Sequence, residues 1–182
     1  NLSSTIFIVN PSLSTKPGMN RFHWDMSHQG PWDANPRRAY SRGAMVTPGD
    51  YTVRLTVGDQ VMSQSFTLKP NPTVVDAGTS VADIEEQTAL ALKVPDLLSQ
   101  GRKLVASLQK ELKEGSNREA AVKEALDKLT AKRITYPQPK IVDQMGYLYF
   151  QFLGADQKPG GDMVALYDNL KAQFEAVKAS LN

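Results

Sequence analysis

The predicted fold rests on GMNRFHWDM, at residues 18–26, and TPGDYTVRLTV, at residues 47–57. From residue 51 to residue 57, aromatic and aliphatic side chains alternate with threonine and arginine, which is typical of a β-strand with one buried face. Pro48 and Gly49 predict a turn before this strand, because proline presets φ and glycine tolerates positive φ. We interpret both stretches as strands of one β-sandwich, joined by a long irregular crossing.

A second strand is expected directly after the first. Gly58 and Asp59 are typical turn residues, and the alternation resumes over residues 61–68, so residues 51–69 are predicted to form a β-hairpin. Tyr51 stands at the start of its strand, behind a turn. Two interpretations of Tyr51 stay open: a tyrosine corner whose hydroxyl ties down the preceding loop, as in immunoglobulin-like sandwiches, or a core tyrosine with a solvated hydroxyl.

Residues 20–26 show the same alternation. The apolar positions of this stretch are expected in the core: Phe22, Trp24 and Met26. The polar residues His23 and Asp25 share the other face, with His28 just beyond, and such a set could suggest a metal site. Solvated polar groups are the favoured interpretation, because structural zinc sites need four ligands at close spacing. The apolar run at residues 5–9 predicts a further buried strand.

Five motifs together carry a resemblance to a known family. They are GMNRFHWDM (18–26), RGAMVTPGDYTVRLTV (42–57), YPQP (136–139), DQMGYLY (143–149) and ADQKPG (155–160). Their order and spacing resemble the C-terminal region of large bacterial sortilin-like proteins, which are often labelled glycosyl hydrolases with bacterial neuraminidase repeats. The resemblance covers nearly the whole chain, from about residue 17 to residue 182.

The resemblance implies an N-terminal immunoglobulin/fibronectin-like β-sandwich, similar to the immunoglobulin-like domain of the flagellar hook-cap protein, followed by a helical tail. It also implies an exported bacterial protein, located in the periplasm, at the outer-membrane surface or outside the cell. The family's β-propeller is absent from this chain, and the hydrolase label belongs to that propeller. The implied partner is therefore a β-propeller of the same parent protein or another subunit, and no enzymatic activity follows for these residues.

The composition of the chain argues against some classes of partner and chemistry but does not identify the function. The 182 residues include 21 lysines and arginines and 19 aspartates and glutamates, and the formal net charge of +2 argues against nucleic acid as a partner. The sequence has no cysteine, so neither disulfides nor thiol chemistry are expected. No apolar run is long enough to span a bilayer, and no signal-like leader stands at the start. Because the chain begins at Asn1 rather than methionine, a fragment or a processed product is expected.

The crossing at residues 27–46 holds the candidate contact residues: Trp32, Arg37, Arg38, Tyr40 and Arg42. Long loops in compact domains tend to be functional or to contact a partner, so an interdomain or intersubunit contact is the preferred interpretation. Aromatic rings also stack on sugars, and a carbohydrate-binding platform on Trp32 and Tyr40 is the alternative. The arginines are interpreted as a solvated or salt-bridged surface rather than a phosphate site.

After a proline-containing linker, the apolar period changes from two residues to between three and four. We therefore predict a domain boundary near Val75, with a β-sandwich at residues 1–75 and a helical part at residues 76–182. A broad apolar stripe predicts a long first helix that ends at Gly115. Pro95 lies inside this helix and either kinks it or splits it into two shorter helices.

The first helix is expected to begin with a capping box formed by Ser80 and Asp83. Three further helices are predicted, at about residues 117–132, 141–153 and 162–181, and the four together form an antiparallel bundle. The last helix carries a near-regular heptad seam that includes Leu170, Phe174 and Val177, which leaves a homo-oligomer open. Met145 and Tyr149 are expected to face inward on the helix before it. Both histidines fall in the β part rather than on inward helix faces, so no metal or other cofactor is expected.

Three functions remain. The first is a non-catalytic accessory module that mediates interdomain or protein–protein contact within a larger sortilin-like β-propeller protein. The second is a carbohydrate-binding module that uses the loop at residues 27–46. The third is a fragment of a glycoside hydrolase whose active site lies elsewhere. The sequence shows no catalytic motif, so the first is preferred and no enzyme is expected in this chain.

Overall fold

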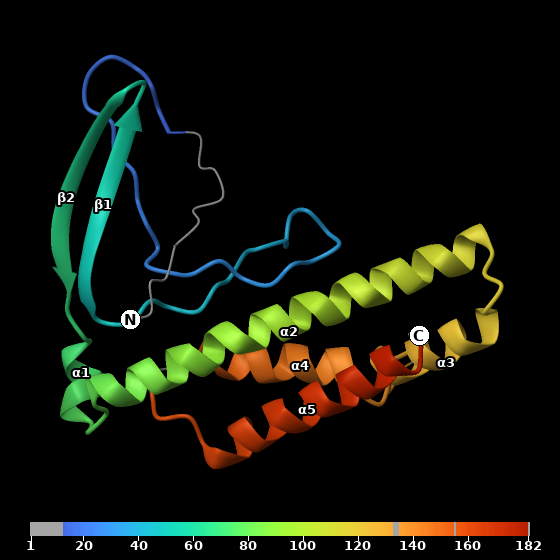
Figure 1. The fold of residues 1–182 in the computed structure, drawn as a ribbon. Coiled ribbons are helices and arrows are strands. Elements are labelled where there is room, and N and C mark those ends of the chain that lie inside the picture. Colours follow the sequence, from blue (N-terminus) through green and yellow to red (C-terminus); the bar gives the residue numbers. More distant parts are fainter. Residues whose placement is uncertain (1–12, 133–134, 155, 182) are drawn as a thin grey trace.

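The structure is a computed structural model that describes residues 13–132, 135–154 and 156–181. In chain order its elements are β1 (Gly49–Val57), β2 (Gln60–Leu68), α1 (Pro72–Asp76), α2 (Val81–Glu114), α3 (Glu119–Leu129), α4 (Ile141–Gln151) and α5 (Gly161–Ala179). Figure 1 shows the two strands as one hairpin at one end of a group of helices, and an irregular segment that runs from beside the hairpin to lie along α2.

The hairpin predicted at residues 51–69 is confirmed. β1 and β2 pair antiparallel, in a register that places Tyr51 opposite Phe66. Gly58 takes a φ of 57° in the connecting turn, a left-handed conformation that glycine adopts without a steric penalty. The Tyr51 hydroxyl donates a 2.6 Å hydrogen bond to the carbonyl oxygen of Thr47. This tyrosine therefore ties down the preceding loop, as a tyrosine corner would.

The predicted immunoglobulin/fibronectin-like β-sandwich is wrong. In the part of the chain that the structure describes, the one sheet consists of β1 and β2, too few strands for a sandwich. Residues 18–26 form no strand, and Ser27 and Met45 make only an isolated β-bridge. A period-two pattern describes side chains, whereas a strand also needs a neighbouring backbone to receive its hydrogen bonds. The strand expected at residues 5–9 lies outside the described residues.

Two of the three side chains predicted from residues 20–26 to fill a sandwich core, those of Phe22 and Met26, are exposed instead. Trp24 differs, because its ring packs edge-on against Tyr51 and Phe66, with centroid distances of 5.8 and 6.3 Å. Among the described residues no second sheet covers the hairpin. The three aromatic rings are therefore a small cluster at the base of an otherwise uncovered hairpin face.

The helix α2 is one continuous helix of 34 residues. The capping box is confirmed: the Asp83 N–H donates to the Ser80 hydroxyl at 3.1 Å, and the Asp83 carboxylate accepts from the Ser80 N–H at 3.0 Å. Gly115 ends the helix with a φ of 88°. Pro95 lies within the helix, so the reading of two separate helices is wrong, while a kink stays a prediction. Ser99 donates a 2.6 Å hydrogen bond to the Pro95 carbonyl oxygen.

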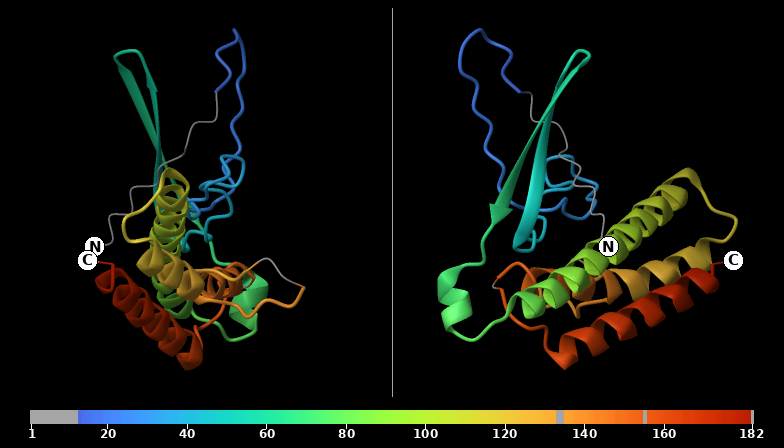
Figure 2. Two further views of the ribbon diagram at one scale, coloured as in Figure 1. Left: turned by 90° about the vertical axis from the view of Figure 1, so that its right-hand side faces the viewer. Right: turned by 60° about the vertical axis from the view of Figure 1, so that its left-hand side comes forward.

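The hydrophobic core lies between α2 and the three helices that follow it. α3, α4 and α5 all contact α2, and α4 packs against α5. The most deeply buried side chains come from all four helices: Val94, Leu98, Leu108, Val122, Leu129, Met145, Leu148, Leu170 and Phe174. Figures 1 and 2 show that α5 begins near the α1 end of α2 and ends beside α3. None of the described helices is long and apolar enough to cross a membrane.

The segment at residues 27–46 packs on the helices, whereas the hairpin extends away from them (Figure 2). Ala44 is buried in the same cluster as the helical core. The short helix α1 lies in the predicted linker, where no helix was expected. The division into domains at residues 1–75 and 76–182 stays a prediction. The helices thus determine the position of the loop that holds the candidate residues.

Candidate functional site

Residues 27–46 form a closed loop whose two legs run side by side. The N–H of His28 donates to the carbonyl oxygen of Ala44 at 2.8 Å, and the N–H of Gly30 donates to that of Tyr40 at 3.0 Å. The N–H of Tyr40 in turn donates to the carbonyl oxygen of Pro31 at 2.9 Å. These backbone bonds make the loop a defined structure rather than an open crossing.

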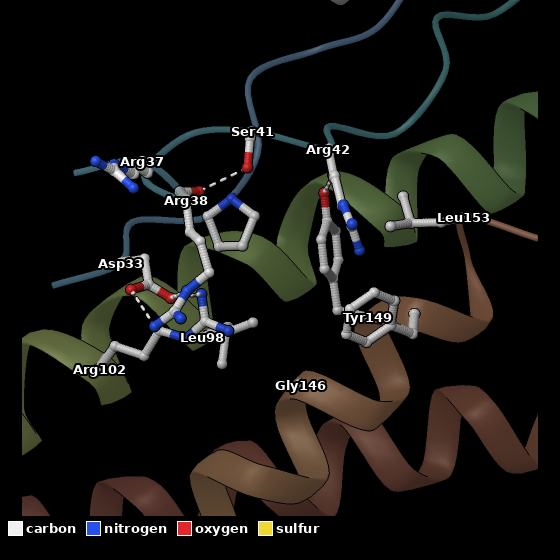
Figure 3. A pocket seen from close by; sticks show the side chains of 12 residues that line it. Asp33, Arg37, Arg38, Ser41, Arg42, Leu98, Arg102, Gly146, Tyr149 and Leu153 are labelled. Carbon is white, nitrogen blue, oxygen red and sulfur yellow. Dashed lines mark hydrogen bonds and ion pairs between the residues drawn. The ribbon is translucent and has the colours of Figure 1, made fainter. Parts of the chain in front are cut away.

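The two sides of the loop, the legs at residues 28–31 and 40–44, approach each other closely, and this approach depends on glycine. A Cβ on Gly30 would overlap the carbonyl oxygen of Ser41, and a Cβ on Gly43 would overlap that of His28. The chain also takes left-handed φ values of 61° at Tyr40 and 57° at Arg42. Each such residue costs on the order of 1–3 kcal/mol and persists where surrounding contacts enforce it, often at functional sites. Figure 3 shows where this loop meets α2 and α4.

Three hydrogen bonds attach the loop to the helices. On α2, the Ser99 hydroxyl accepts from the N–H of Trp32 at 2.8 Å, and the guanidinium of Arg102 donates to the carbonyl oxygen of Trp32 at 3.1 Å. On α4, the Tyr149 hydroxyl donates to the carbonyl oxygen of Arg42 at 2.6 Å. The loop is therefore fixed to two helices that are far apart in the sequence.

Tyr149 serves as a hydrogen-bond donor. Its side chain is buried in the helical core. Burial raises the pKa of Tyr149 to about 12, because a buried phenolate would lose its hydration, although the positive charge of Arg102 opposes this effect. The hydroxyl thus stays protonated at neutral pH and keeps its bond to the loop. This geometry makes Tyr149 a support for the loop rather than a base.

A cavity of about 470 Å³ lies between the loop, α2 and α4, and we call it the arginine pocket (Figure 3). Four arginines and one aspartate line it: Arg37, Arg38, Arg42, Arg102 and Asp33. Apolar side chains form much of the remaining wall: Pro31, Leu98, Phe150 and Leu153. The pocket therefore combines excess positive charge with apolar surface.

Asp33 links two of these arginines. Its carboxylate accepts hydrogen bonds from Arg38 Nε at 3.2 Å and Arg38 Nη2 at 3.0 Å, and it lies 3.4 Å from Nη1 of Arg102. It also accepts from the N–H of Asn35 at 2.8 Å. The Asp33 side chain is only 12% exposed, and its bonds with Arg38 hold the pKa of Asp33 below the usual range. In the described part of the chain, Arg37 and Arg42 have no ion-pair partner.

The five candidate residues fall into two separate cavities. Arg37, Arg38 and Arg42 line the arginine pocket, whereas Trp32 and Tyr40 line a second cavity of about 310 Å³ that shares no lining residue with the first. The second cavity also contains polar side chains from α2: Asp96, Ser99 and Lys103. The aromatic rings and the arginines of the loop thus line different cavities, so the expected arrangement of aromatic rings among arginines does not form one surface.

The hairpin presents a second kind of candidate site. The register places Tyr51, Val53, Leu55, Val57, Met62 and Phe66 on one face, together with the polar residues Gln60 and Gln64. Beyond the Trp24 cluster this face is open, with exposed fractions between 44% and 58% at Val53, Leu55, Val57 and Met62. We call this surface the hairpin face. This face was predicted to be buried, but no second sheet covers it within the described residues.

The two histidines do not gather metal ligands. Within the described residues, no group of three or more histidine, cysteine, aspartate or glutamate side chains could hold a metal ion. Burial lowers the pKa of His28, which lies in the loop beside Ala44. His23 is exposed on the irregular stretch. The His-x-Asp pattern therefore belongs to no such group in the part of the chain that the structure describes.

Three residues of the site were missed as site residues from sequence alone. Asp33 lies five residues before Arg38 in the sequence. This short separation between an acidic and a basic residue was the one signal that could have identified Asp33 as a site residue. Arg102 and Tyr149 come from helices distant in the chain, and only Tyr149 was identified, as an inward residue of its helix. Comparisons of the chain with protein-family models, curated proteins and solved structures found no match.

Proposed function

We propose that this chain is a non-catalytic interaction module that docks on another protein domain through its hairpin face. The observation that carries the proposal is the exposure of that face. A two-stranded hairpin is at best marginally stable alone in water, and its stability usually depends on packing against further strands or a helix. Contiguous exposed apolar patches commonly mark contact sites.

The two faces of the hairpin differ in polarity. Opposite the hairpin face, Thr52, Arg54, Thr56, Ser63 and Ser65 are polar, and Val61 is the one apolar residue between Gly49 and Leu68 on that side. Antiparallel sheets with one dry and one solvated face normally pack on one side only. Each strand also has one edge that pairs with no strand in the described part of the chain, and such edges can receive a strand of a partner.

The partner that we propose is a β-propeller domain of the same parent protein, or another protein subunit, in an exported bacterial protein. Its support is the resemblance described above. A second copy of this chain is the alternative occupant. It would not use the heptad seam of α5, because Leu170, Phe174 and Val177 of that seam are buried in the chain's own core.

Leu55→Asp is expected to weaken association with the separately produced propeller domain by about tenfold or more, because it places a charge in an apolar contact. Isothermal titration calorimetry measures this change. Thr56→Asp is the matched control, since Thr56 lies next to Leu55 on the opposite face. Equal affinities for the two variants would contradict docking through the hairpin face.

A carbohydrate-binding module is the second candidate, because Trp32 and Tyr40 line one cavity together with polar groups of α2. Aromatic rings beside hydrogen-bonding side chains suit the mixed apolar and polar surfaces of a sugar. If sugar binding occurs, Trp32→Ala is expected to reduce affinity for the bound oligosaccharide at least tenfold in calorimetric titration, while Phe22→Ala leaves it unchanged. Equal affinities in both variants would place the sugar elsewhere.

The glycoside hydrolase fragment receives less support from the two cavities at the loop. Among the described residues, each is lined by a single carboxylate, from Asp33 or Asp96. Glycoside hydrolysis commonly uses two carboxyl groups on either side of the bond that is cleaved. A hydrolase fragment therefore stays a prediction without a site.

A further inference from the structure

We propose that the arginine pocket binds a small phosphate monoester, with the phosphate at the arginines and the organic group against the apolar wall. This binding site is independent of the interaction proposed for the hairpin face. Arg38 is exposed and salt-bridged to Asp33, as the interpretation of a solvated or salt-bridged surface expects, and the structure also places the arginines around a cavity.

The charge of the pocket is not balanced by the protein. Asp33 is the one acidic residue among its lining residues, and it is already bonded to both Arg38 and Arg102. Arg37 and Arg42 have no acidic partner among the described residues, although they line the same cavity. Excess positive charge around a concave site attracts anions, and the effect is strongest where solvent is partly excluded. A dianion would offset part of the excess charge of the four arginines that line the pocket.

Asp33 holds the guanidinium groups of Arg38 and Arg102 in place at one side of the pocket. In Figure 3 the side chain of Arg42 extends alongside the ring of Tyr149, while Arg38 and Arg102 meet at Asp33 on the other side of the cavity. The backbone of Arg42 is fixed by the hydrogen bond from Tyr149. Preorganised donors lose less entropy on binding, and the planar guanidinium matches the oxygens of a phosphate.

Arg37 points in a different direction from Arg42. In Figure 3 its side chain points away from Tyr149, and the residue is exposed, as Arg38 and Arg42 are. A long side chain without an ion-pair partner can turn over the opening when an anion enters. Arg37 is therefore expected to add charge to the site without being needed for the fold.

The apolar wall determines which kind of phosphate fits. Leu98 belongs to the buried core, Leu153 is partly buried against that core, and Phe150 adds an exposed ring. A volume of about 470 Å³ is within the range of small-molecule sites, which runs from about 300 to 1,000 Å³. Inorganic phosphate would leave the apolar wall solvated, whereas a monoester with an apolar or aromatic group would cover it.

The test is calorimetric titration of the full chain with phenyl phosphate at low ionic strength. Saturable binding is expected, stronger than that of inorganic phosphate and absent with benzyl alcohol, which has the ring but no charge. The double variant Arg37→Gln/Arg42→Gln is expected to bind at least tenfold more weakly. Arg54→Gln removes the same kind of charge from the polar face of the hairpin and is expected to change the affinity less than twofold.

Several results would overturn the proposal: no binding of phenyl phosphate, inorganic phosphate binding as tightly as the ester, or equal losses in the double variant and in Arg54→Gln. Circular dichroism establishes that each variant is folded. If the double variant does not fold, Arg37→Gln alone decides the question, since the exposed side chain of Arg37 has no ion-pair partner in the described chain. Affinity unchanged in that variant would then reject the site as described.

Discussion

Gly43→Ala is expected to lower the free energy of unfolding by about 3 kcal/mol, the upper part of the range for overpacking. The new Cβ would overlap the carbonyl oxygen of His28 in the opposite leg of the loop. A backbone carbonyl cannot turn aside as a flexible side chain can, so the legs must separate. The 2.8 Å bond from the His28 N–H to Ala44 would then be lost. Because this loop carries Arg42, binding at the arginine pocket should fall as well.

Urea denaturation followed by circular dichroism measures this effect. Gly146→Ala is the matched control, because Gly146 lies in α4 and an added Cβ there would meet no atom within 4 Å. Alanine is favoured over glycine in helices by about 1 kcal/mol, so the control should be as stable as the wild type or more stable. If Gly43→Ala proved as stable as this control, the legs could not approach as closely as the structure shows.

Asp33→Asn is expected to lower the free energy of unfolding by about 2 kcal/mol at neutral pH, the typical value for hydrogen bonds with charged groups. The substitution removes the negative charge that holds Arg38 and Arg102 together. Arg38 is 67% exposed, so water replaces much of its interaction, whereas Arg102 is 30% exposed and loses more. Asp59→Asn, at the exposed hairpin turn, is the control and should change stability by less than about 0.5 kcal/mol.

The effect of Asp33→Asn is expected to depend on pH in a defined direction. The pKa of Asp33 is lowered in the folded state from its usual value of 3.8, chiefly by the hydrogen bond from Arg38. Its stabilisation is therefore complete above the unfolded pKa and is lost as the pH falls through the folded pKa. The difference between wild type and variant should be constant near neutral pH and shrink below about pH 4. A difference that grew on acidification would contradict this assignment.

Elements that depend on neighbouring residues were predictable. The turn at Gly58, the capping box of Ser80 and Asp83, and the end of α2 at Gly115 all follow from local backbone preferences, and the structure contains each of them. The inward positions of α4 and α5, such as Met145 and Phe174, also followed from the apolar period. The sandwich was wrong because it required backbone partners from other segments, which a side-chain pattern does not specify.

The candidate loop was predicted only in part. Its composition identified Trp32, Tyr40 and the three arginines as unusual residues for a crossing between strands. Their division between two cavities could not be predicted, because it depends on left-handed residues at Tyr40 and Arg42 and on the close approach of the legs at Gly43. These features arise from contacts between residues distant in the chain.

The amino-acid sequence by itself determined the hairpin, the long capped helix and the apolar faces of the helices that follow, because propensity, capping and periodicity act over a few residues. Only the tertiary structure decided that the hairpin face is uncovered, and that Asp33, Arg102 and Tyr149 meet beside Arg42. Contacts between segments some 70 to 107 residues apart depend on how the helices pack, and packing is settled jointly by the whole core.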